Sequence, residues 1–349
     1  PPLWTGRRPQ RPEPAVIVPE PPPLPGPRVR LQELASEVAS ALEFMTGRFG
    51  PPALETLAVS PVPGTFGQGF PGLIYLSTLA YLNPSDNVLT RLTPRNQTFF
   101  TDLLQAHETA HQWWGNIVTA AGYHDAWLME ALANYSALLY LERRKGRRAA
   151  QSMLEEYRTA LLEKLESGGF VDSAGPIVLG DRLESSLAPH ARRAIIYGKG
   201  SWILHMLRCR MGDARFLEML AELRRRHEWK TVSTAQFREL AARYMPPKAP
   251  DANLEYFFDQ WVYGTGIPAL KLTHATKGKG RAMRVVGTVT QSEVDPLFTA
   301  VVPVEVQFAR GKSITHLVET GPDPVEFSIP VTQAPSRVLL DPARTVLRR

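Results

Sequence analysis

Two histidines and two glutamates between positions 107 and 130 have the residue types and the spacing of a metal site. His107 and His111 are four residues apart, so on a helix they lie about one turn apart on one face and can direct both imidazoles at one ion. Glu130 supplies a carboxylate from a second amphipathic segment, and Glu108 projects beside the histidines. A catalytic Zn²⁺ takes three protein ligands and keeps a fourth position open for water. The spacing therefore predicts one zinc ion bound by His107, His111 and Glu130.

The residues around this motif resemble those of a known family. His-Glu-x-x-His continues into Trp-Trp-Gly-Asn, and Asp-Ala-Trp-Leu-Met-Glu follows at residues 125–130. This order is similar to that of the gluzincin metallopeptidases of the M1 aminopeptidase family. In that family the two histidines and the distant glutamate bind zinc, and the glutamate between the histidines is the general base. The resemblance implies these roles for His107, His111, Glu130 and Glu108.

Two later segments extend the resemblance. Residues 197–207 are similar to the family's Tyr-x-Lys-Gly segment, in which the tyrosine hydroxyl stabilises the oxyanion, and this implies that role for Tyr197. Residues 257–268 resemble the end of the family's catalytic domain and its entry into a small β domain. The resemblance covers about residue 30 to the C-terminus. It implies an α+β fold, a thermolysin-like and mostly helical zinc peptidase domain followed by a small β-sandwich.

One element of the family pattern is changed. The family carries Gly-Ala-Met-Glu-Asn as an edge strand along the substrate, and its glutamate holds the free α-amine. The corresponding substrate-binding residues here are Gly67, Gln68, Gly69 and Phe70, with Gly69 in the place of the glutamate. A glycine cannot pair with an ammonium group. The expected activity is therefore hydrolysis of peptides or proteins, with three readings open: exopeptidase action, endopeptidase action, or an amine anchor supplied by another domain.

Hydrophobic periodicity divides the chain into three regions. Residues 1–29 are rich in proline and predict a linker or tail, residues 30–264 the peptidase domain, and residues 265–349 the β-sandwich. A first helix from residue 31 should end at Gly50. Further helices are expected near 98–117, 124–145, 147–166, 191–211, 213–226, 234–244 and 253–263. Strands are expected at 57–62 and 72–76, beside the zinc site, and at 283–289, 301–308, 314–318, 325–330 and 337–340.

Some residues near the motif could support it without binding the ion. A metal-bound histidine usually donates its second ring nitrogen to a carboxylate or carbonyl. Asn134 lies one helical turn after Glu130 and could reach a ligand histidine, although a surface amide is an equal alternative, and Asp125 is a second candidate support. His124 breaks the pattern and is expected near the ligands or at the surface.

Composition narrows the class of protein. Hydrophobic residues make up 44% of the 349 residues, enough for a substantial core and more than one domain. The net charge of +6 comes from clusters at expected helix ends and turns, which favours solvated surface over nucleic-acid binding. The single cysteine, Cys209, excludes an internal disulfide and is expected in the core. No apolar run approaches the ~20 residues of a transmembrane helix.

The start of the chain leaves location and partners open. It shows no signal-peptide core, and the compartment is not indicated. The family's large N-terminal β domain has no counterpart, so we expect it to be lost, to reside on a partner chain or to lie upstream. A noncatalytic interaction module that has kept the peptidase fold is the alternative function. The presence of all five zinc-site and catalytic residues favours the enzyme.

Overall fold

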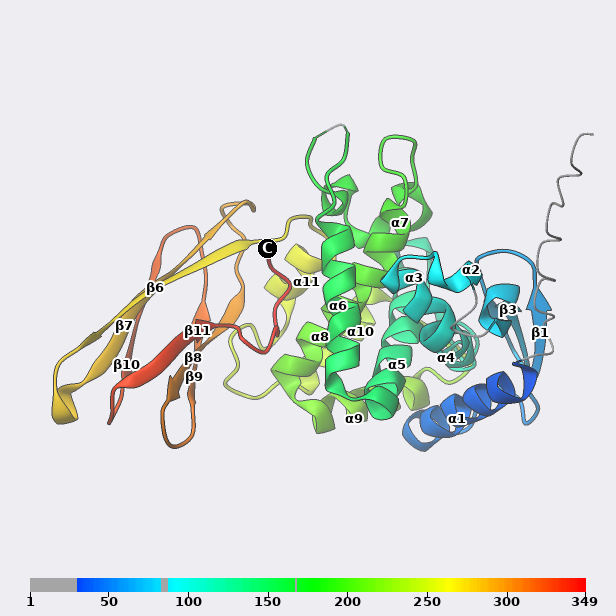
Figure 1. The fold of residues 1–349 in the computed structure, drawn as a ribbon, viewed down its shortest axis with the longest axis horizontal. Coiled ribbons are helices and arrows are strands. Elements are labelled where there is room, and N and C mark those ends of the chain that lie inside the picture. The colour runs from blue at the N-terminus through cyan, green and yellow to red at the C-terminus, as the bar shows by residue number, and fades with distance from the viewer. Residues whose placement is uncertain (1–29, 83–86, 167) are drawn as a thin grey trace, which may run out of the picture.

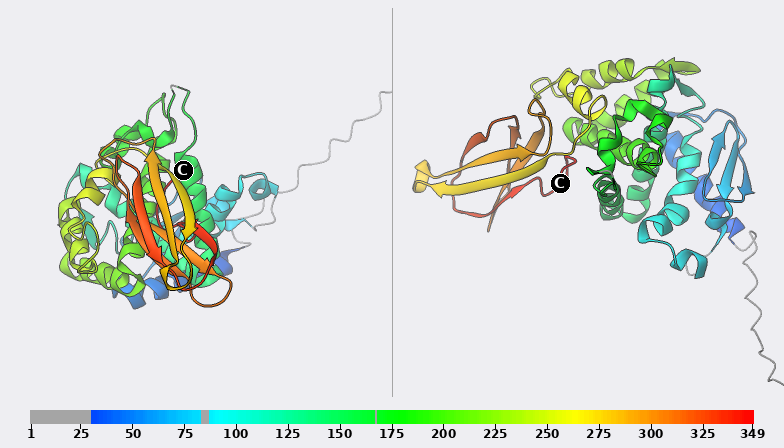
Figure 2. Two further views of the ribbon diagram at one scale, coloured as in Figure 1. Left: turned by 90° about the vertical axis from the view of Figure 1, so that its left-hand side faces the viewer. Right: turned by 90° about the horizontal axis from the view of Figure 1, so that it is seen from above.

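A computed structural model describes residues 30–82, 87–166 and 168–349. The proline-rich segment predicted for residues 1–29 lies outside this range. A small sheet stands at one end of the molecule, helices form its middle and a β domain forms the other end (Figures 1 and 2). The α+β class expected from the sequence is thus confirmed. The predicted boundary between residues 264 and 265 falls between the last helix and the first strand of the β domain.

The helical body is built around one central helix, α5 (Trp127–Lys145). Apolar residues occupy nearly every face of α5 from residue 127 to residue 141, and these side chains are buried. The surrounding helices are α1 (Leu31–Phe49), α4 (Leu104–Ala110), α6 (Arg147–Leu161), α8 (Gly200–Met211), α9 (Asp213–Arg226), α10 (Thr234–Arg243) and α11 (Glu255–Trp261), with short helices α2 (Asn87–Thr90), α3 (Pro94–Thr98) and α7 (Ala191–Arg193). Gly50, with φ of +87°, ends α1 as expected.

A mixed sheet packs beside α4. Its strands are β1 (Ala58–Val62), β2 (Gln68–Phe70) and β3 (Leu73–Ser77), in the order β1-β3-β2. β1 runs parallel to β3, and β2 pairs antiparallel at the other edge. The strands expected at 57–62 and 72–76 are therefore confirmed. β2 is the edge strand in the position that the family resemblance implied.

The prediction of a helix over residues 98–117 is wrong at both ends. The helical run starts at Pro94, contains a π-helical segment, η2 (Phe99–Leu103), and ends at Ala110. Beyond His111 the chain turns through Gly115, whose φ of +104° a side chain would strain. It then enters β4 (Val118–Ala120), which pairs parallel with β5 (Lys230–Val232). Strands of three residues are too short to show a period-two pattern, so this pair was not predicted.

The helix expected at 191–211 is continuous but not uniform. A second π-helical segment, η6 (Ala194–Lys199), lies between α7 and α8. The prediction for Cys209 is wrong, because this residue near the end of α8 is exposed. Its apolar neighbours Met206 and Met211 are buried, whereas Cys209 lies on the side of α8 that faces the β domain.

The β domain consists of two antiparallel three-stranded sheets. One has the order β10-β7-β6 and the other β11-β8-β9. The strands are β6 (Ala269–Lys277), β7 (Arg284–Ser292), β8 (Val301–Phe308), β9 (Ile314–Glu319), β10 (Val325–Pro330) and β11 (Pro335–Leu340). Val285, Val304 and Phe327 belong to the apolar layer between the sheets. β6 was not predicted, because most of its side chains are exposed at a sheet edge.

Two adjacent tryptophans fix the end of α4 in the helical body. The rings of Trp113 and Trp114 are fully buried and both contact Phe49. Trp113 Nε1 donates to the carbonyl of Gly50, and Trp114 Nε1 donates to Ser136 Oγ on α5. The turn that follows His111 is therefore held by α1 and α5. Within the described ranges, none of the helices has both the length and the apolarity to cross a membrane.

Candidate active site

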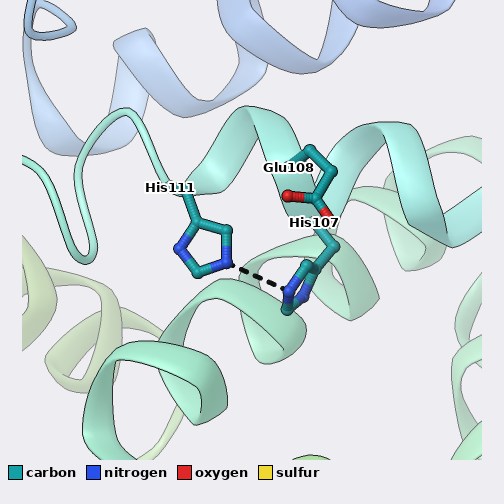
Figure 3. A group of neighbouring side chains, drawn as sticks. All are labelled: His107, Glu108 and His111. Carbon is teal, nitrogen blue, oxygen red and sulfur yellow. Dashed lines mark hydrogen bonds between the residues drawn. The ribbon is translucent and has the colours of Figure 1, made fainter. Parts of the chain in front are cut away.

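Three candidate metal ligands converge from two helices. α4 presents His107, the residue after its last turn is His111, and the first turn of α5 presents Glu130. The two Nε2 atoms lie 3.1 Å apart (Figure 3), and Glu130 Oε2 lies 3.4 Å from His107 Nε2 and 3.6 Å from His111 Nε2. Ligand atoms at the usual zinc distances stand ~3.3 Å apart in a tetrahedral site. The three separations therefore fit one tetrahedral zinc ion.

The hydrogen bond of His111 suits metal binding, whereas Nδ1 of His107 is buried without a hydrogen-bond partner among the described residues. His111 Nδ1 lies 2.7 Å from the carbonyl oxygen of Trp114, which can only accept, so the neutral ring carries its proton on Nδ1 and its lone pair on Nε2. His107 is buried among the other helices. Glu130 Oε2 is buried without a hydrogen-bond partner among the described residues. Such an oxygen, facing two imidazole nitrogens, is what a metal ligand requires.

Two carboxylates share the site but have opposite pKa shifts. Burial raises the pKa of Glu108 above its ordinary value, and the nearby histidines oppose this only in part. Burial also opposes ionisation of Glu130, but the two neighbouring histidines outweigh it and hold its pKa well below the ordinary value. Although burial disfavours a charged His111, the two carboxylates raise its pKa to about 9. The electrostatic potential at the three candidate ligand atoms is therefore negative enough to favour a bound cation.

Proximity alone would also allow Glu108 as a ligand. Its carboxylate and the two imidazoles have atoms within 4.8 Å of one another. Glu130 fits the third ligand position better, because one of its oxygens lies within 3.6 Å of both Nε2 atoms and the pKa of its carboxyl is the lower of the two. Glu108 is left beside the ligands (Figure 3) with a pKa moved toward neutrality, as a general base requires.

The edge strand β2 lies directly on α4. A Cβ at Gly67 would be 2.5 Å from Glu108 Oε1, and a Cβ at Gly69 would be 2.6 Å from the backbone oxygen of Glu108 and 2.7 Å from His111 Cβ. The backbone of Gly69 also forms a hydrogen bond with the Glu108 carboxylate. A side chain at position 69 would therefore run into the helix that carries the histidines. Because the strand lies so close to the helix, position 69 has no space for a carboxylate side chain.

Gln112 fastens the far end of β2 and was not singled out in the sequence. Its Nε2 donates to the carbonyl of Phe70 at 2.8 Å, and its Oε1 accepts from the backbone of Gly72 at 2.9 Å. Gln68 and Phe70 project to the exposed side of the strand. The position of Gln112 directly after His111 was the available signal. Its partners lie forty residues earlier, so the sequence did not reveal them.

Tyr197 lies beside the histidines, as the resemblance implied. It belongs to η6, and its ring centroid is 5.6 Å from that of His107. Its hydroxyl interacts with Glu130 and with Arg192. Burial and the negative charge of Glu130 raise the pKa of the phenol above its ordinary value. The hydroxyl therefore keeps its proton and can donate it in a hydrogen bond.

Comparison with known proteins now adds the family. The sequence profile of the Peptidase family M1 domain matches residues 87–261, half of the chain, and the match contains the candidate ligands, Glu108 and Tyr197. The chain belongs to peptidase family M1. Its M1 fold is similar to a crystal structure of Legionella pneumophila aminopeptidase A in complex with aspartic acid, with a TM-score of 0.67 and 18% identity over 90% of this chain and 34% of that one.

Curated M1 relatives are much longer than this chain. Aminopeptidase N of Lactococcus lactis subsp. lactis is 28% identical over 48% of this chain and 19% of its own length. Glutamyl aminopeptidase of Sus scrofa is 26% identical over 66% and 23%, and aminopeptidase 2 of Candida albicans is 24% identical over 76% and 28%. The matched part of this M1 chain thus spans about a fifth to a quarter of these relatives.

The proposed supporting residues of the M1 site have other partners. Asn134 is buried, and its Nδ2 donates to Tyr157 at 3.0 Å, to Ser201 at 2.9 Å and to the backbone carbonyl of Tyr197 at 3.3 Å. A ligand histidine is not among the partners found in the described part of the chain. Asn134 therefore holds the segment that carries Tyr197. The contacts with Tyr157 and Ser201 join three helices and were not foreseen.

Asp125 and His124 lie away from the ligands of the M1 site. Asp125 Oδ1 accepts from the backbone N–H of Thr234 at 2.7 Å, which caps the start of α10. His124 is exposed, and its Nδ1 lies 2.9 Å from the carbonyl of Val178, so the surface alternative applies to it. Both residues organise the turn before α5. Their effect on Glu130 is through the placement of that helix.

A cavity of about 200 Å³ opens beside the M1 site. Gly67 is the member of the predicted substrate-contact group that reaches its wall. Its lining also includes His107, Glu108, Tyr197, Arg192 and Arg193. The candidate general base, one candidate ligand and the candidate oxyanion donor thus share one cavity.

Proposed function

We propose that this M1 chain is a zinc-dependent peptidase. The observation that carries the proposal is the convergence of His107, His111 and Glu130 with tetrahedral separations, beside a second carboxylate, Glu108, that is not needed as a ligand. A zinc ion bound there supplies Lewis acidity, which polarises a peptide carbonyl and lowers the pKa of water. Family membership supports a hydrolase that acts on peptide bonds.

In the proposed reaction Glu108 moves the proton. Its carboxylate lies in the cavity, and its raised pKa makes it a better base than an ordinary exposed glutamate. It accepts a proton from the attacking water and delivers it to the leaving nitrogen. The Gly69 backbone hydrogen bond holds the carboxylate in place during both steps.

Tyr197 is the proposed donor to the developing oxyanion. As water attacks, negative charge grows on the carbonyl oxygen, and a donor already aimed there lowers the barrier. The hydroxyl keeps its proton because burial and Glu130 raise its pKa. Asn134 holds the backbone of Tyr197 through its carbonyl, so the donor is positioned before substrate binds.

Aminopeptidase specificity is not part of this proposal. Gly69 offers no carboxylate for a free α-amine, and a side chain there would collide with α4. We propose action on internal or unselected peptide bonds, with an anchor from a further domain or partner chain as the other reading. The short span relative to the curated relatives keeps that second reading open.

The deciding experiment uses matched peptides with free and with acetylated N-termini. Purified chain and Glu108→Gln are assayed side by side, and bound zinc is measured by mass spectrometry. Equal cleavage of both peptides, lost in Glu108→Gln with zinc retained, is the expected result. Cleavage of the free peptide alone would establish an aminopeptidase despite Gly69. Full activity in Glu108→Gln would refute the mechanism, and no hydrolysis by the zinc-loaded chain would favour a noncatalytic module.

A further inference from the structure

One wall of the cavity is cationic. Arg192 and Arg193 belong to α7, the short helix that precedes Tyr197, and both line the cavity together with His107 and Glu108. The Arg193 guanidinium lies 4.8 Å from the centroid of the Phe99 ring, which also borders the cavity. Two positively charged side chains thus border the space that contains Glu108, and both also reach solvent.

Arg192 is held in a defined position. Its Nε lies 2.5 Å from Asp181 Oδ1, and its guanidinium also forms a hydrogen bond with the Tyr197 hydroxyl. The side chain is 34% exposed, so it faces solvent as well as the cavity. A guanidinium carries five N–H donors. One carboxylate oxygen and one phenol oxygen do not engage all of them. Asp181 is largely exposed, so screening weakens its neutralising effect on Arg192.

The cavity lining offers little negative charge to a cationic substrate group. Gly67 lies against the Glu108 carboxylate and has no room for a side chain. Among the described lining residues, Glu108 is the only acid, and it is committed to proton transfer. An ammonium group entering the cavity would meet two guanidinium groups, and a carboxylate would be attracted to both.

We propose that this site selects peptides with a carboxylate next to the scissile bond, with Arg192 as its hydrogen-bonding anchor. The contact with Tyr197 places the Arg192 guanidinium beside the reacting carbonyl, so the carboxylate belongs to a residue flanking the cleaved bond. It can be an aspartate or glutamate side chain or the α-carboxylate of a peptide end. Arg193 adds positive potential to the same wall. The inference rests on the proposed peptidase function, because it assigns the substrate of that site.

Binding to an inactive form tests the inference without turnover. Zinc-loaded Glu108→Gln is titrated with fluorescent acetylated peptides that carry Glu, Gln or Lys at one position and end in an amide. A fourth peptide carries Gln and ends in a free carboxylate. Either the Glu peptide or the free-carboxylate peptide should bind about tenfold more tightly than the Gln amide, as expected for one charge-assisted hydrogen bond. Which of the two does so identifies the source of the carboxylate.

Variants in the same background assign the effect to Arg192. Arg192→Gln should reduce the carboxylate preference by about tenfold, and Arg192→Lys should keep part of it. The matched control is Arg238→Gln, an arginine of α10 that is paired with Glu255 outside the cavity, and it should leave the preference unchanged. Thermal unfolding of each variant checks that the fold is retained.

Four results would overturn the inference. In the Glu108→Gln protein with both arginines intact, equal affinity for all four peptides would overturn it. Tightest binding of the Lys peptide would overturn it as well. A preference that survives in folded Arg192→Gln would remove Arg192 as the anchor. Carboxylate-selective binding with no hydrolysis by the zinc-loaded unmodified chain would instead refute the peptidase proposal alone. Unselective cleavage of all peptides would refute the inference and leave that proposal intact.

Discussion

Lys199 and Asp172 form an ion pair inside the helical body, with Nζ 2.9 Å from Oδ1 and side-chain exposures of 0% and 3%. Lys199 Nζ also donates to the carbonyl of Gly264, and Asp172 Oδ2 accepts from the backbone of Gly266 at 2.7 Å. Lys199 is two residues beyond Tyr197 in η6. The pair therefore ties the segment that carries the proposed oxyanion donor to the residues that lead into the β domain.

Breaking this pair should be costly. Lys199→Met leaves Asp172 as a buried charge without its partner, and we expect a loss of about 3–5 kcal/mol in the free energy of unfolding, measured with urea. The double variant Lys199→Met with Asp172→Asn should recover part of the loss, because no buried charge remains. A loss below about 1 kcal/mol in the single variant would show that the pair is not important for stability.

Glu108→Gln should separate activity from stability. We expect the rate of peptide hydrolysis to fall by about 10²- to 10⁴-fold, with bound zinc unchanged. Burial raises the pKa of Glu108, so its ionised form costs stability, and this cost grows as the pH rises above the ordinary carboxyl value. After zinc removal, Glu108→Gln should melt at the same or a higher temperature than the unmodified chain at neutral pH. A clearly lower melting temperature would mean that the charge stabilises the fold.

Tyr197→Phe should affect the chemical step. Loss of one oxyanion donor lowers kcat by about 10²- to 10³-fold. The affinity for a peptide, measured in the Glu108→Gln background, should change little, because the phenol ring and its buried environment remain. Steady-state kinetics with the matched peptides measures the first effect. A rise in KM at constant kcat would instead place Tyr197 in substrate binding.

Glycine at positions 67 and 69 should be required by packing. Gly69→Ala places a methyl group against the backbone of α4, and we expect a loss of about 1–3 kcal/mol in the free energy of unfolding. Gly69→Glu should lose at least as much and should not create a preference for free α-amines. The matched control is Gly47→Ala in α1, where a Cβ meets nothing within 4 Å, and it should gain about 0.5–1 kcal/mol. Equal effects at both sites would contradict the close approach of β2 and α4.

The stability provided by Arg208 should depend on pH. Arg208 Nη1 lies 2.7 Å from Glu142 Oε2, and its Nε lies 2.8 Å from Asp213 Oδ1. Burial opposes ionisation of Glu142, but Arg208 outweighs it, and the hydrogen bond from Arg208 lowers the pKa of Asp213. Because both pKa values are depressed in the fold, the stabilisation is present above the ordinary carboxyl values and is lost as the pH falls through the folded values.

Arg208→Met should therefore lose about 1–2 kcal/mol at pH 7 and much less near pH 3. Denaturant unfolding of the variant and the unmodified chain at both pH values measures the difference. A gap of the same size at the two pH values would mean that Arg208 stabilises the fold by packing alone.

The sequence predicted what depends on local spacing. His107 and His111 could be selected because helix geometry places residues four apart on one face, and Glu130 was selected as a carboxylate on a second amphipathic helix. The structure brings the three together. The sequence did not reveal Gln112, whose partners lie about forty residues earlier in the chain, or Arg192, whose place in the cavity wall depends on the tertiary fold. Roles that depend on the approach of distant segments leave no periodic signal.

The position of Gly69 illustrates the same limit. The sequence placed Gly69 where the family resemblance implies an anchoring carboxylate, but only the structure shows that the backbone of α4 fills the space a side chain would need. Asn134 was expected to support a ligand histidine, but its side chain instead donates to the backbone carbonyl of Tyr197. Asn134 lies one helical turn after Glu130 and lines the cavity beside the candidate site. Its partners come from α6, η6 and α8, which the spacing could not specify.

The geometry of the candidate site depends on the number of residues in the two π-helical segments. Phe99–Leu103 directly precedes the helix with His107, and Ala194–Lys199 contains Tyr197 itself. A π-turn holds one residue more than the α-turn it replaces, so deleting one residue would restore α geometry and rotate everything on one side by ~100°. Substitutions in these segments alter individual contacts. A one-residue deletion would instead turn His107 or Tyr197 away from Glu130. The number of residues in each segment therefore matters for the site as much as the identity of each amino acid.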